Sequence, residues 1–101
     1  MTPARLRAFG YVRVIPSAPP PEVQEHRISS YCHQQGWTLA GVFRTVRFAA
    51  LAELVQQVKA TDAQRVILVR EVAEGLERQD PTVWAAVLGG LTKQGALVVT
   101  I

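Results

Sequence analysis

Two short segments of the chain are almost entirely apolar and rich in β-branched residues. They are RVILVR, over Arg65–Arg70, and ALVVTI, over Ala96–Ile101. Runs of this kind are typical of strands that are covered on both faces, as in parallel sheets. Two further segments, Ala8–Val14 and Thr38–Phe43, are also predicted as strands.

Three helical patterns lie between these strands. The first begins near Pro21 and ends at Gly36, and the other two carry apolar residues at the spacing of a helix with one buried face. Asp80 is placed to cap the third helix, and Pro81 suits its first turn. The residues expected to face the core are Val23, Ile28, Tyr31 and Cys32 in the first helix, Leu51, Leu54, Val55 and Val58 in the second, and Trp84, Val87, Leu88 and Leu91 in the third.

The predicted order of elements is therefore β-α-β-α-β-α-β. Short connections and right-handed crossovers favour an α/β three-layer sandwich with a mostly parallel sheet, as in flavodoxin-like folds. We expect its four strands in the order 2-1-3-4. Within the third helix, the pair Gly89-Gly90 indicates a close backbone contact, and a helix from another chain packed against it is the alternative. Alternation along the first strand predicts one face with Phe9, Tyr11 and Arg13 and an opposite face with Gly10, Val12 and Val14.

The totals fit a single domain over residues 1–101, of which 49% are apolar. No apolar run approaches the ~20 residues of a membrane span. The lone cysteine, Cys32, excludes an internal disulfide and indicates a reducing, cytoplasmic compartment. The formal net charge is +3, but the basic residues are scattered along the sequence, so we expect only weak, sequence-independent binding to DNA.

Metal and cofactor chemistry find little support in the sequence. His26 and His33 lie seven residues apart on the first helix, ~10 Å along its axis, which is too far for them to share an ion. No Gly-rich loop follows the first strand, so neither a dinucleotide site nor a P-loop is indicated. We expect no metal and no cofactor.

Several segments together resemble one family of DNA enzymes. The order and spacing of four segments resemble the catalytic domain of the serine recombinases, the resolvase–invertase family. These segments are RAFGYVRV over residues 7–14, the pair Tyr31-Cys32, QQGW over residues 34–37, and KQGALVVTI over residues 93–101. The resemblance implies a resolvase-like fold. In that family a serine at the end of the first strand attacks a DNA phosphodiester, while arginines hold the phosphate.

The resemblance also shows where this chain departs from the family. Arg13 matches the strand arginine, but Ile15 falls at the position of the nucleophile. Ser17 lies two residues further, ~6.6 Å along an extended chain, and Pro16 is expected to stiffen the segment against folding back. Ser17 is therefore a weak candidate for the nucleophile.

The arginine positions of the family differ as well. Without gaps, the family's DRLxR motif aligns with Ala73–Glu77, so that Glu74 and Glu77 replace both arginines. An inserted residue or two could bring Arg78 onto the second position. In the segment after the second strand, Arg44 and Arg47 could contact DNA in place of the family's loop arginine, although both also fit solvated surface charges. The resemblance places a DNA-binding domain elsewhere in such chains, and we expect none within these residues.

Two principal hypotheses follow from these departures. The first is a catalytically inactive serine-recombinase-like domain that serves as a protein-interaction or assembly module, with a homo-oligomer or another protein as partner. The second is an active DNA recombinase domain that uses Ser17 as nucleophile with Arg13 and Arg78. A small-ligand-binding flavodoxin-like domain is a third, and only the fold class supports it.

Overall fold

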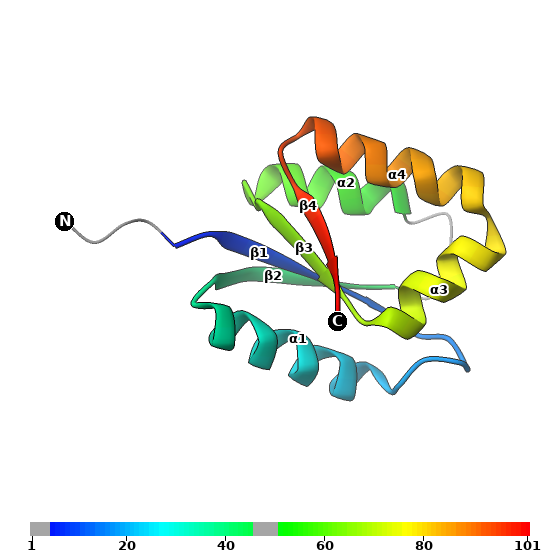
Figure 1. Cartoon of the computed structure of the whole chain (residues 1–101), viewed down its shortest axis with the longest axis horizontal. Coiled ribbons are helices and arrows are strands. Elements are labelled where there is room, and N and C mark those ends of the chain that lie inside the picture. Colours follow the sequence, from blue (N-terminus) through cyan, green and yellow to red (C-terminus); the bar gives the residue numbers. More distant parts are fainter. Residues whose placement is uncertain (1–4, 46–50) are drawn as a thin grey trace.

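A four-stranded parallel sheet forms the centre of the computed structural model, which describes residues 5–45 and 51–101. Its strands are β1 (Arg7–Arg13), β2 (Thr38–Thr45), β3 (Arg65–Leu68) and β4 (Leu97–Thr100). They lie in the order β2-β1-β3-β4, and every neighbouring pair is parallel (Figure 1). The predicted fold class and strand order are confirmed.

Helices cover both faces of the sheet. One face carries α1 (Pro21–Gln35), and the other carries α2 (Leu51–Ala60), α3 (Arg70–Gln79) and α4 (Pro81–Lys93) (Figure 1). Two buried clusters hold these three layers together. The cluster under α1 contains Ala8, Val12, Ile28, Cys32 and Ile67. The larger cluster on the other face includes Phe9, Tyr11, Leu54, Val58, Val66, Leu68, Val72, Leu76, Trp84, Val87 and Leu91.

The alternation predicted for β1 is confirmed from Phe9 to Val12, whereas Val14 lies beyond the strand and is exposed. Phe9 and Tyr11 enter the larger cluster, whereas Val12 enters the cluster under α1. Gly10 also faces α1, because a Cβ atom at this position would lie 3.2 Å from Ile28 Cγ2. The side chain of Leu51, predicted to face the core, lies outside the described residues.

Helix α3 was not expected from the sequence. The apolar run RVILVR was predicted as strand through Arg70, but β3 ends at Leu68 and Arg70 already begins a helix. The boundary is hard to detect because Val69, at the N-cap, supplies no side-chain hydrogen bond. The pair Val72 and Leu76, four residues apart and both buried, is the helical signal that this segment does contain.

The buried face of α1 is rotated from the predicted one. Val23, expected to face the core, is 45% exposed, and the adjacent Gln24 is fully buried instead. Ile28 and Cys32 are buried as predicted. Hydropathy alone points the wrong way here, because Gln24 is buried through hydrogen bonds to backbone groups.

The close backbone contact expected at the glycine pair of α4 is found at neither position. A Cβ atom at Gly89 would meet nothing within 4 Å, and one at Gly90 would lie 3.8 Å from Val55 Cγ1 of α2, an ordinary packing distance. Asp80 caps this helix as predicted, since its Oδ1 accepts the Val83 N–H at 3.1 Å.

Candidate functional site

The chain turns sharply just beyond the carboxyl end of β1. The Ala18 N–H donates to the carbonyl of Ile15 at 3.1 Å, which places Pro16 and Ser17 at the two central positions of a β-turn. Proline at the first central position pre-sets the backbone of such a turn. The expectation that Pro16 would stiffen the segment against folding back is therefore wrong, because the turn brings Ala18, the residue after Ser17, back to Ile15.

This turn and helix α3 line one cavity of about 450 Å³. Ile15 and Ser17 contribute from the turn, and Gly75, Arg78 and Gln79 contribute from α3. The three α3 residues follow the i, i+3, i+4 spacing of one helix face. Ile15 fits against the helix because residue 75 is glycine: a Cβ atom there would lie 3.1 Å from Ile15 Cδ1.

Arg13 lies behind this cavity rather than in it. Its side chain is 4% exposed, and Nη2 donates to Gln79 Oε1 at 3.1 Å. Gln79, which sequence reasoning did not single out, is thus the link between Arg13 and the cavity wall. Burial raises the pKa of the neighbouring Tyr11 phenol, and the Arg13 guanidinium opposes this shift. At neutral pH the phenol is therefore protonated and is no candidate for a general base.

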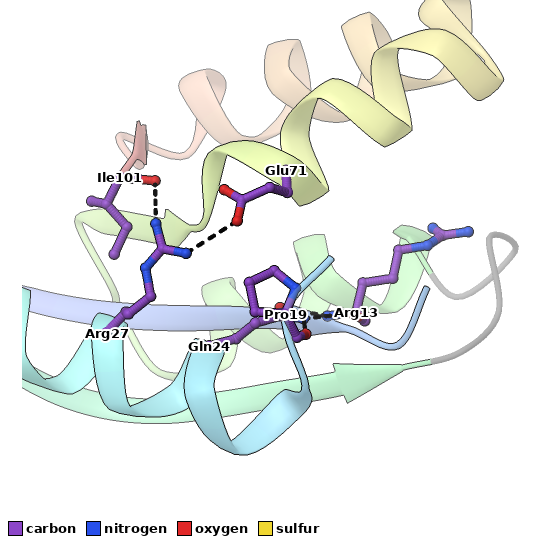
Figure 2. Close-up of polar contacts among 6 residues, drawn as sticks. All are labelled: Arg13, Pro19, Gln24, Arg27, Glu71 and Ile101. Atoms are coloured by element: carbon purple, nitrogen blue, oxygen red, sulfur yellow. Dashed lines mark hydrogen bonds and ion pairs between the residues drawn. The ribbon is translucent and has the colours of Figure 1, made fainter. Parts of the chain in front are cut away.

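Gln24 fixes the end of β1 from α1 (Figure 2). Its Oε1 accepts the Arg13 N–H at 3.2 Å, and its Nε2 donates to the carbonyls of Arg13 at 2.8 Å and Pro19 at 2.7 Å. The end of the strand and Pro19, the residue after the turn, are therefore held by the same side chain. Gln24 lies four residues before the buried Ile28, on the same face of α1, but its polar side chain hides this position from a hydropathy pattern.

The two glutamates expected to face the nucleophile position lie elsewhere. Glu74 and Glu77 line an adjoining pocket of about 230 Å³ with Arg78, and a groove between α3, α4 and β4. Neither lines the cavity that contains Ser17. Among the described residues, the charged side chain that lines the cavity is therefore Arg78 and not a glutamate.

Arg44 and Arg47 were proposed as DNA contacts. Arg44 forms ion pairs with two glutamates of α1, at 3.0 Å to Glu25 Oε2 and 3.8 Å to Glu22 Oε1. These contacts hold its charge on the outer side of β2 and not in the Ser17 cavity. Arg47 lies outside the described residues. A role for either residue in DNA binding remains a prediction.

A second polar link joins α1 to α3 and β4 (Figure 2). Arg27 Nη1 lies 3.2 Å from Glu71 Oε2, and Arg27 Nη2 donates to the Ile101 carbonyl at 3.3 Å. The pKa of Glu71 is lowered by a hydrogen bond from its own backbone N–H and by the Arg27 guanidinium. Sequence reasoning missed this link because its partners are 44 and 74 residues away from Arg27.

Over residues 5–45 and 51–101, no three His, Cys, Asp or Glu side chains gather in a way that could hold a metal ion. In the same part of the chain, no helix is long and apolar enough to cross a membrane.

The order of strands and the helices on both faces give this chain the resolvase-like α/β fold of serine recombinase catalytic domains. The C-terminal catalytic domain of ISC1926 TnpA, an IS607-like serine recombinase, superimposes with a TM-score of 0.73 and 17% identity over 94% of this chain and 69% of that chain. The N-terminal catalytic domain of TP901-1 integrase superimposes with a TM-score of 0.76 and 16% identity over 93% of this chain and 75% of that one. No protein-family model and no curated protein matches the sequence.

Proposed function

We propose that this domain is a catalytically inactive serine-recombinase-like module that acts by assembling with another protein chain. The observation that carries the proposal is Ile15. It stands where the resemblance to serine recombinases places the nucleophile, and its side chain packs toward Gly75 of α3. An aliphatic side chain in this position has no atom that can attack a phosphodiester.

The surrounding charges support the loss of catalysis. Phosphoryl transfer depends on positive charge held against the phosphate oxygens. Arg13 is buried and hydrogen-bonded to Gln79, and Arg78 is the one cation lining the cavity within the described part of the chain. Arg78 Nε also donates to the Glu74 carbonyl of its own helix at 3.4 Å, so even this cation is directed along α3.

The outer edge of β4 supports a role in assembly. Strand β4 ends the sheet on one side, and its Leu97 side chain is 51% exposed. A groove of about 420 Å³ runs beside it, with Trp84 and Leu88 of α4 and Val98 of β4 in its lining. An open strand edge next to apolar side chains favours pairing with a second copy of the chain.

Sedimentation equilibrium tests the assembly role. We expect self-association in the high micromolar range that Leu97→Lys abolishes. Val23→Lys is the matched control, because Val23 is similarly exposed but lies on α1, away from the β4 edge. A protein that stays strictly monomeric up to high micromolar concentration, or that dissociates equally in both variants, would contradict self-assembly through this edge.

An active recombinase domain is the second candidate. The observation that favours it is that Ser17 and Arg78 line the same cavity. In this reading Ser17 attacks the phosphodiester and Arg78, with Arg13 behind it, supplies positive charge. A covalent protein–DNA adduct that requires Ser17 would distinguish this candidate from the inactive module.

A further inference from the structure

A basic cleft lies at the amino-terminal ends of the strands, whereas the Ser17 cavity lies at their carboxyl-terminal ends. Where the cleft lies, β1 begins, and helices α2 and α4 end (Figure 1). The cleft has a volume of about 730 Å³ and is lined by Arg5 and Arg7 at the start of β1, by Lys59 of α2 and by Lys93 of α4. Residues that are far apart in the sequence therefore form one basic surface.

The cleft carries the whole net charge of the protein. Its lining contains four cations and one carboxylate, Asp62, a net charge of +3. The chain as a whole has eleven Lys and Arg and eight Asp and Glu, also a net charge of +3. The seven cations and seven carboxylates elsewhere therefore cancel. The four cations of the cleft are scattered along the sequence, and the fold brings them together. Positive charge gathered in one cleft attracts anions.

None of the four cations is neutralised by another side chain. In residues 5–45 and 51–101, Arg5, Arg7, Lys59 and Lys93 form no ion pair, and all four are exposed. By contrast, Arg27 and Arg44 are paired with glutamates. The cleft thus offers four positive groups to a ligand without first breaking a salt bridge.

Helix capping accounts for this cluster only in part. Lysines in the last turn commonly complement the negative end of a helix. Here, however, backbone N–H groups already donate to carbonyls in the last turn of both helices: Asp62 N–H donates to Lys59 O in α2, and Gly95 N–H donates to Thr92 O in α4. Nor can capping explain Arg5 and Arg7, which belong to β1 and the residues before it.

The cleft wall also contains the side-chain amides of Gln64 and Gln94, both held in place by hydrogen bonds. Gln64 Oε1 accepts the Arg7 N–H at 3.2 Å, which leaves the amide nitrogen of Gln64 to donate. Gln94 Nε2 donates to Val55 O of α2 at 3.4 Å and so ties α4 to α2 across the cleft. Two guanidinium groups, two ammonium groups and an amide donor suit phosphate oxygens, because guanidinium groups bind them bidentately.

We infer that this cleft binds a ligand with several phosphate groups in a row, either a nucleic acid strand or a free oligophosphate. A single phosphate would fill only a small part of a cleft of about 730 Å³ and would engage few of its four cations. This site is separate from the Ser17 cavity, so the inference does not depend on whether the domain is catalytically active.

The test uses two probes and two double variants. Calorimetry measures the binding of tripolyphosphate, and fluorescence anisotropy measures the binding of a labelled single-stranded oligonucleotide, at low salt and at about 0.15 M. Lys59→Gln/Lys93→Gln alters the cleft. Arg65→Gln/Arg70→Gln is the matched control, because neither residue lines the cleft and both variants lower the formal net charge from +3 to +1.

We expect the cleft variant to bind tripolyphosphate about tenfold more weakly and the control to lose no more than about twofold. Amide shifts on titration should centre on Gln64 and its neighbours. An oligonucleotide that binds and is displaced by tripolyphosphate identifies nucleic acid as the source of the phosphates, whereas binding of tripolyphosphate alone identifies a free oligophosphate. Equal losses in the two variants, or no binding of either probe at low salt, would overturn the inference.

Discussion

The side-chain amide of Gln24 pairs with both backbone groups of Arg13, accepting its N–H at 3.2 Å and donating to its carbonyl at 2.8 Å (Figure 2). Strand β1 pairs with β3 only from Ala8 to Gly10. At Arg13, an amide from α1 therefore bonds to both backbone groups as a neighbouring strand would, and it does so where the candidate site begins.

Replacing this amide should destabilise the protein strongly. Gln24→Met keeps the length of the side chain but leaves two buried backbone groups of Arg13 and the part-buried carbonyl of Pro19 without their partner. We expect the free energy of unfolding in urea to fall by about 2–4 kcal/mol. Gln34→Met on the exposed side of the same helix is the control, with a change within about 0.5 kcal/mol. Equal effects of the two substitutions would contradict this role.

Removing a glycine from α4 should have the opposite effect. Gly89 is exposed inside the helix, and an added Cβ atom would meet nothing within 4 Å. Gly89→Ala should therefore raise the free energy of unfolding by up to about 1 kcal/mol, the difference in helix propensity. Thermal unfolding of the two proteins measures it. A loss of stability that grows with protein concentration would instead reveal that another chain packs closely against this glycine.

The ion pair between Arg27 and Glu71 predicts a pH dependence. A hydrogen bond from the backbone of Glu71 and the charge of Arg27 lower the pKa of Glu71 in the folded protein. A lowered folded pKa contributes stability that is complete above the ordinary carboxyl range, about pH 4.3, and is lost as the pH falls through the lower folded value. The stability difference between the native protein and Glu71→Gln should therefore be constant near neutral pH and shrink in acid.

Urea unfolding at a series of pH values measures this difference. Glu53→Gln serves as the control, because Glu53 is an exposed carboxylate of α2 that forms no ion pair in the described part of the chain. If the difference between the native protein and Glu71→Gln were the same at pH 3 as at pH 7, the ion pair would not contribute to folding.

Catalysis should not return with a hydroxyl alone. Ile15→Ser restores an oxygen at the family's nucleophile position, but Arg13 stays buried and bound to Gln79, which leaves Arg78 as the cation of that cavity. One missing phosphate-binding arginine can reduce phosphoryl transfer by a factor of about a thousand or more. We therefore expect no covalent protein–DNA adduct from the native protein or from Ile15→Ser on a denaturing gel, with the domain fused to a DNA-binding domain.

Two results on that gel would contradict the expectation that no adduct forms. An adduct from the native protein that disappears in Ser17→Ala would establish the active alternative. An adduct from Ile15→Ser that persists in Ile15→Ser/Ser17→Ala would show that the cavity retains enough positive charge for catalysis despite the position of Arg13.

The sequence predicted the sheet well and its connections less well. The strands and the two faces of β1 follow from hydrophobic patterns, as the burial of Phe9 and Val12 on opposite faces shows, and the parallel arrangement follows from the alternation of strands and helices. Helix α3 was not predicted, because it begins at Arg70 directly after an apolar strand and has no capping side chain. At the site, Ile15 and Arg13 were found through a motif, but the roles of Gln24 and Gln79 depend on contacts between distant segments that no local pattern encodes.

The central place of β1 has a consequence for how the chain reaches its native state. This strand is made first, yet Ala8 pairs with Leu39 of β2 and with Arg65 of β3, 57 residues further along. Parallel pairing over such separations slows folding, because the entropy cost of closing the loops comes before the strand contacts that offset it. Until then an apolar strand has two open edges, the condition in which nascent chains aggregate. Refolding yield should therefore depend on dilution and on chaperones more than the stability of the finished domain would suggest.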